Sequence, residues 1–192
     1  TLPVLALLWG SPVAAQYVIS ARTALLHYVE GKVLLTHRPE RPQSKLFPPL
    51  ADRDVLDTES GRAEILLNPS VFLRLDEHSS MRLLSGRITH PSVELLSGRF
   101  VLEVIEVHRR EPVTLTYGNA TIAILKPGVY RIDAQPAGVR VFGGKVLVQG
   151  DGQQITVGKG QALPLDGTWT RRKFDRAKTD AFDLWSRHRS QF

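Results

Sequence analysis

Short apolar runs alternate with glycine, proline and polar turn residues along most of the chain. Residues 71–75 alternate apolar and polar side chains in their second half, which is typical of a half-buried strand. The strand-like runs show no helical period, and the proline-rich residues 36–49 predict an exposed loop without regular pairing. Many short strands at close spacing predict an all-β fold, an antiparallel β-sandwich or roll of glycine-punctuated strands.

Three turns share one pattern, in which an apolar run leads to a glycine, a cation and a second apolar run. The glycines are Gly31, Gly98 and Gly144. Because glycine reaches positive φ without steric cost, each copy predicts a β-hairpin or a sharp bend. The glycines are unequally spaced, so the pattern does not indicate the fixed period of a solenoid.

The tail, residues 169–192, departs from the strand pattern and predicts an amphipathic helix of about three turns. Phe174, Phe182 and Trp185 fall on one helical face, and Asp175 is placed to cap it. This aromatic face packs on the β body or, alternatively, docks a partner protein. In the second case Phe182, Trp185 and Arg187 are the candidate partner-binding residues.

The first residues predict a signal peptide. Residues 1–15 are uncharged and apolar and end in Val13-Ala14-Ala15, small residues that a signal peptidase accepts, so Gln16 is the expected mature start. A first buried strand is the alternative. The run is too short to span a bilayer. The expected organisation is therefore a signal peptide (1–15), a β domain (16–168) and a basic amphipathic helical tail (169–192), in a periplasmic or secreted protein.

Charge and cysteine content narrow the expected partners. The net charge is +6, and residues 171–192 hold seven cations against three acids. Such a tail can meet an acidic glycan, phospholipid headgroups or an acidic protein surface, or it can be a solvated helix face. The chain has no cysteine, which excludes disulfides, thiolate metal sites and the acylated cysteine of a lipoprotein.

The sequence contains no recognisable catalytic motif. The histidines are scattered singly, and the Asp76-Glu77-His78 cluster is expected to be an exposed turn rather than a metal site. There is no Gly-x-Ser-x-Gly elbow and no phosphate-cradling glycine loop. Glu64, Glu94 and Glu103 resemble the solvent faces of alternating strands. We therefore expect no enzyme activity, no cofactor, no metal and no nucleic-acid partner. A weaker alternative is an enzyme whose carboxylate pair comes from distant strands.

The order of the motifs resembles the FecR-like domain, a periplasmic all-β module of iron-transport signalling regulators. The resemblance covers residues 25–165. It rests on Val55-Leu-Asp-Thr58, Leu95-Leu-Ser-Gly98-Arg-Phe, Pro127-Gly-Val-Tyr-Arg-Ile132, the segment 139–148 that matches the family's closing hairpin, and Val157-Gly-Lys-Gly160-Gln161. Asn68-Pro69-Ser70 replaces the family's usual Asp-Gly-Ser turn. The cytoplasmic anti-sigma segment and membrane helix of those regulators have no counterpart in this sequence, so sigma-factor control is not carried over.

The resemblance implies a stand-alone exported FecR-like protein without enzyme activity. Its expected role is protein–protein interaction in envelope sensing, signalling or assembly, with an envelope protein of unknown identity as partner. The alternative is a cell-wall or glycan-binding module, in which the basic tail and aromatics such as Tyr117 or Trp169 contact an acidic glycan.

Overall fold

The computed structural model describes residues 24–36, 38–40, 49–108 and 112–191, so the predicted signal peptide lies outside the described residues. The elements are β1 (Leu25–Leu35), β2 (Arg38–Glu40), β3 (Val55–Asn68), β4 (Val71–Leu75), β5 (Ser79–Ser85), β6 (Ser92–Ser97), β7 (Arg99–Val104), β8 (Thr114–Tyr117), β9 (Ala120–Lys126), β10 (Gly128–Ala134), β11 (Ala137–Val141), β12 (Lys145–Gly150), β13 (Gln153–Gly158), β14 (Gln161–Pro164), β15 (Arg172–Lys173) and α1 (Ala181–Arg189). The predicted all-β fold is confirmed.

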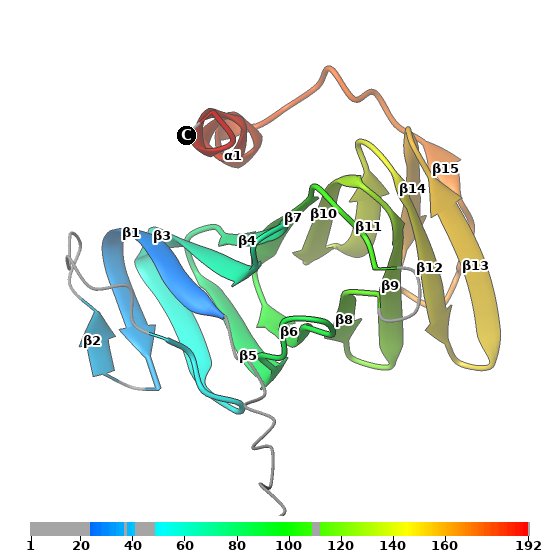
Figure 1. Ribbon diagram of the computed structural model, residues 1–192. Helices are drawn as coiled ribbons and strands as arrows, with labels where there is room; N and C mark the ends of the chain where they lie inside the picture. The colour runs from blue at the N-terminus through cyan, green and yellow to red at the C-terminus, as the bar shows by residue number, and fades with distance from the viewer. Residues whose placement is uncertain (1–23, 37, 41–48, 109–111, 192) are drawn as a thin grey trace, which may run out of the picture.

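The strands form one continuous sheet, with the order β13-β12-β9-β8-β6-β5-β3-β4-β7-β10-β11-β14-β15, and with β1 beside β3 and β2 beside β1. Pairing is antiparallel except between β6 and β8. The long strand β3 pairs with β5 through Val55–Thr58 and with β4 through the segment 63–68. The sheet therefore continues through β3 into two layers, which Figure 1 shows one above the other.

The core lies between these layers. In the layer of β4, β7 and β10, inward side chains such as Leu73, Leu102 and Tyr130 are fully buried. In the layer of β5, β9 and β12, Met81 and Ile122 are fully buried too and belong to the same hydrophobic cluster. Alternation of apolar and polar residues along each strand produces this arrangement, because successive side chains point to opposite faces of a sheet.

Two of the three glycine patterns are sharp bends, as predicted, and none is a hairpin. Gly98 joins β6 to β7 and Gly144 joins β11 to β12, and neither strand pair shares hydrogen bonds. At each corner, where φ is +95° and +92°, the chain passes from one layer to the other. Gly31 lies inside β1 at a register shift opposite Gly61. The closing hairpin expected over 139–148 is therefore wrong.

The tail differs from the predicted helix. Arg172–Lys173 forms β15 and extends the sheet beside β14, so part of the tail belongs to the β body. The helix covers only Ala181–Arg189. Its N-cap is Asp180, which forms a capping box with Asp183, and the expected cap Asp175 lies outside the helix. Phe174 is also outside it and packs edge-on against Phe142, with ring centroids 5.1 Å apart.

The proline-rich segment also differs in part from the prediction. Arg38–Glu40 pairs with β1 as strand β2, although Pro39 lies within it. Strand β2 pairs with β1 alone, so it is an edge strand, where the missing N–H of a proline is tolerated.

Candidate functional site

Helix α1 lies across the outer face of the layer formed by β3, β4, β7 and β10 (Figure 1). We call this surface the helix-binding face and define it by the outward residues of these four strands. One row runs across it in register, from Glu64 through Arg74 and Val101 to Arg131. A solvent-facing row of this kind is expected to be exposed, but three of its charged side chains are almost fully buried.

Arg74 is buried at the centre of the face with about 2% of its surface exposed. Its Nε donates to Glu64 on the neighbouring strand at 2.6 Å. Its Nη1 pairs with Glu103 at 2.8 Å and donates to the hydroxyls of Ser186 and Ser190 on α1, at 3.0 and 3.2 Å. A buried guanidinium is costly unless its donors are satisfied, so the helix completes the environment of this arginine.

Arg131 lies under the N-terminus of α1, and the helix completes the environment of this buried guanidinium as it does for Arg74. Its Nε pairs with Asp133 at 2.9 Å, its Nη1 donates to Asp183 at 2.7 Å, and its Nη2 pairs with Asp180 at 2.7 Å. Burial acts to lower the pKa of Arg131, but the contacts with these carboxylates outweigh it and raise the pKa above its ordinary value. The hydrogen bond from Arg131 in turn holds the pKa of Asp180 well below its usual range.

Glu64 completes the network beneath the C-terminus of the helix. It accepts from Arg74, from Nη2 of Arg189 at 2.9 Å, and contacts Nδ1 of His27 at 2.7 Å. Burial acts to raise the pKa of Glu64, and the hydrogen bonds from Arg189, His27 and Arg74 outweigh this and lower it. The expectation that Glu64 faces solvent is therefore wrong, because α1 covers the outer face of β3.

The charges of helix and face are complementary along the helix axis. The acidic end of α1, with Asp180 and Asp183, meets Arg131, and Arg99 also lies 3.6 Å from Asp180. The basic end, with Arg189, meets Glu64. Acidic residues at the start of a helix and basic residues at its end also favour the helix dipole. The face is thus built to receive a helix of this polarity.

The predicted partner-binding residues Phe182 and Trp185 face the body of the protein. Phe182 is about 1% exposed, and its ring stacks on Trp185 at 6.0 Å under the guanidinium of Arg131. Trp185 donates through Nε1 to Glu30 at 2.8 Å and packs against Tyr28. While α1 is docked, the ring of Phe182 is buried and the half-buried ring of Trp185 contacts the body, so both hold the helix on the sheet.

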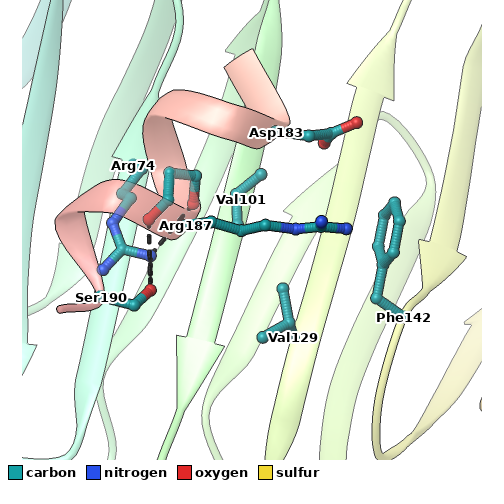
Figure 2. A pocket seen from close by; sticks show the side chains of 8 residues that line it. Arg74, Val101, Val129, Phe142, Asp183, Arg187 and Ser190 are labelled. Carbon is teal, nitrogen blue, oxygen red and sulfur yellow. Dashed lines mark hydrogen bonds between the residues drawn. The ribbon is translucent and has the colours of Figure 1, made fainter. Parts of the chain in front are cut away.

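Arg187 is the one predicted site residue that remains exposed. Figure 2 shows its side chain extending above Val101 and Val129 toward Phe142. Together with Arg74, Asp183, Ser186 and Ser190, these residues line a pocket of about 120 Å³ beside the helix. The largest exposed apolar side chain of α1 is Leu184, at 57%.

Aromatic residues considered as glycan contacts are engaged elsewhere. Trp169 is about 6% exposed and belongs to the core cluster. The hydroxyl of Tyr117 donates to the carbonyl of Ala134 at 3.1 Å. Trp169 presents no open aromatic face on which a sugar ring could stack, and Tyr117 is half-buried, so the geometry does not favour the glycan-binding alternative at Trp169.

Asp76, part of the cluster considered above as a metal site, is engaged in ion pairs instead. Asp76 is buried and pairs with Arg62 at 2.8 Å and with Arg99, which corrects the expectation that all of 76–78 is exposed. Within the part of the chain that the structure describes, no three acidic or histidine side chains gather as metal ligands would. In the same residues, no helix has the length and apolar character needed to cross a membrane.

Comparison with known proteins shows a likeness of fold. No protein-family model matches the chain, and no curated protein matches it. Two crystal structures of a "putative anti-sigma factor" from Parabacteroides distasonis resemble it, both with a TM-score of 0.56, at 17% and 16% identity. Each likeness covers 69% of this chain, and the chain spans 63% and 64% of the two solved chains, less than two thirds of their length. At this identity the likeness concerns the all-β fold.

Proposed function

We propose that this protein is a FecR-like protein-interaction module without enzyme activity, which acts outside the cytoplasm in envelope sensing, signalling or assembly. The motif order in the sequence and the fold shared with the anti-sigma-factor structures support the family and the signalling role. The expected signal peptide supports the location. An envelope protein is the proposed partner.

One observation carries the proposal: the outer face of β3, β4, β7 and β10 binds a helix, and does so through complementary charges. Arg131 and Arg74 donate hydrogen bonds to Asp183 and Ser186 of α1, and Glu64 accepts one from Arg189 near the end of the helix. A surface with this charge pattern binds a partner helix with an acidic start and a basic end in the same manner.

The occupant of the face is a short helix that can leave it. Helix α1 has nine residues, which is too few for stable helicity in isolation. The segment 175–178 before it is exposed, and Phe182 lies outside the main core cluster. Local opening of such an element costs less than unfolding of the domain. A partner helix therefore competes with α1 for the face, and α1 keeps the face covered in its absence.

Site-specific photo-crosslinking in the native envelope tests this function. A photoreactive residue at Val129, on the face beneath α1, is expected to form an adduct with one defined protein. The yield is expected to rise when Phe182→Ala loosens the helix. The matched control carries the same residue at Leu125, which is 41% exposed on β9 of the other layer, and gives no such adduct. Intramolecular adducts alone would refute helix exchange.

A separate assay distinguishes the protein-binding role from the glycan-binding alternative. Sedimentation of the purified protein with sacculi, at rising salt, measures attachment to the cell wall. Wall fragments recovered without any protein adduct at Val129, in a salt-sensitive manner, would replace the proposal by a cell-wall-binding function.

A further inference from the structure

Strand β13 ends the sheet on one side and exposes its outer edge. A two-residue turn, Asp151-Gly152, joins it to β12, so the flanking pair Gly150 and Gln153 shares hydrogen bonds. Pairs along an antiparallel ladder alternate, so the N–H and C=O groups of Gln154, Thr156 and Gly158 point away from β12. In the described part of the chain no strand pairs with this edge.

Side chains cap only part of the edge. The N–H of Gly158 donates to Oε1 of Gln161 at 2.8 Å, and the C=O of Thr156 accepts from Nη1 of Arg171 at 3.1 Å. Both bonds confirm that these groups point outward. The N–H of Thr156 and both backbone groups of Gln154 are left for another chain. A strand edge in this state is a template for strand addition.

An open hollow lies along the same edge. Gln154, Ile155 and Thr156 line one side of it and the segment 169–171 lines the other, with a volume of about 600 Å³. Trp169 anchors that segment: its ring is buried against Gly150, and its φ of +46° is rare for a residue with a side chain. The segment approaches β13 through side chains and so leaves room beside the strand.

Cations outnumber acids at this end of the molecule. Residues 145–178 hold seven cations against three acids, a surplus of four in a chain of net charge +6. None of the seven forms an ion pair with a carboxylate of the described residues, whereas the cations of the helix-binding face are paired. They are Lys145, Lys159, Arg171, Arg172, Lys173, Arg176 and Lys178. Their field favours an anionic partner.

From the open edge, the hollow and the unpaired cations together, we infer that β13 binds an extended acidic segment of a partner protein by strand addition. Backbone groups of Gln154 and Thr156 pair with the incoming strand, and acidic side chains lie near Arg171 and its neighbours. The inference rests on the proposed function in treating the chain as a protein-binding module, but it uses β13, an end strand of the sheet, whereas α1 lies over β3, β4, β7 and β10 in its middle (Figure 1).

Fluorescence anisotropy with a labelled decapeptide of alternating Glu and Val tests the inference on the full chain. A second peptide has the same sequence with N-methyl groups on alternate amides, so its charge is kept and its strand pairing is blocked. We expect the first peptide to bind at least tenfold more tightly than the second. Equal binding of both, or tighter binding of a sulfated glycan, would show a general polyanion site and overturn the inference, as would no binding.

Two variants locate the site. Thr156→Pro removes one outward N–H without touching the ladder to β12 and is expected to weaken peptide binding at least tenfold. Replacing Arg171, Arg172 and Lys173 by glutamine is expected to weaken it by a similar factor. The matched control replaces the exposed cations Lys32, Arg53 and Arg87 by glutamine and leaves binding within twofold. Circular dichroism confirms that each variant folds.

Unchanged binding in the first two variants would refute the site. Because the crosslink at Val129 reports on the helix-binding face, its loss would count against the proposed function alone, and loss of peptide binding would count against the strand-edge site alone.

Discussion

Phe182→Ala is expected to release α1 while the sheet stays folded. Phe182 is fully buried, but it packs against Trp185 of the same helix and Arg131 of the outer face. It does not belong to the core between the layers. Truncation of a buried phenylalanine costs about 3–5 kcal/mol. Since about 1.4 kcal/mol corresponds to a factor of ten, the population of the undocked helix should rise by about a hundredfold or more.

Amide hydrogen exchange measures this change element by element. Amides of α1 should lose about a hundredfold or more of their protection in Phe182→Ala, while those of β7 and β10 keep theirs. Leu184→Ala is the matched control, because Leu184 is 57% exposed on the same helix and alanine is a good helix former. Equal loss of protection in the strands and in α1 would refute the reasoning, since it would make the helix part of the cooperative core.

Two further predictions concern the ion pairs of α1 and the glycine corner at Gly144. Hydrogen bonds in the docked state lower the pKa of Glu64 and of Asp180 below their ordinary values of 4.5 and 3.8. Undocking removes Arg189 from Glu64 and Arg131 from Asp180, so each pKa rises toward its ordinary value. The stability that these carboxylates give to docking is therefore fully present above the undocked pKa values and is lost as the pH falls through the docked ones. Exchange protection of α1 should therefore be constant from neutral pH down to about 5 and fall below about pH 4, and protection that rises on acidification would contradict this sign. Gly144→Ala should cost about 2–4 kcal/mol in urea unfolding, because φ is +92° and a Cβ would overlap the hydroxyl of Tyr130. Gly152→Ala, at φ +74° with open space around it, should cost only about 1 kcal/mol, and equal costs would show that Tyr130 moves aside.

The local pattern of the sequence predicts the fold class, because alternation along strands such as β4 depends on neighbouring residues alone. It also places an aromatic face on the tail. It does not predict that Phe174 leaves that face, because the extended pairing of Arg172 and Lys173 with β14 overrides the helical spacing. The bends at the glycine corners are predicted. Whether the two strands at a corner pair with each other is not, because that depends on whether they belong to the same layer.

Less of the candidate site than of the fold class could be predicted from the sequence. Glu64 has the alternation of a solvent-facing residue, and only the docking of a helix 125 positions away makes it buried. The signal that could have found it is the joint presence of Arg74 and Arg131 at outward positions of strands that become neighbours. Without the strand order, that row cannot be assembled.

The separation along the chain between the face and its cover has a consequence for biosynthesis. Arg74 and its helical partner Ser186 are 112 residues apart, and Glu64 and Arg189 are 125 apart. A ribosome makes β3, β4, β7 and β10 before it makes α1, so the growing polypeptide carries the arginines of the helix-binding face for some time before their own cover exists. Helix α1 is the last of these elements to be made, so it closes the face last.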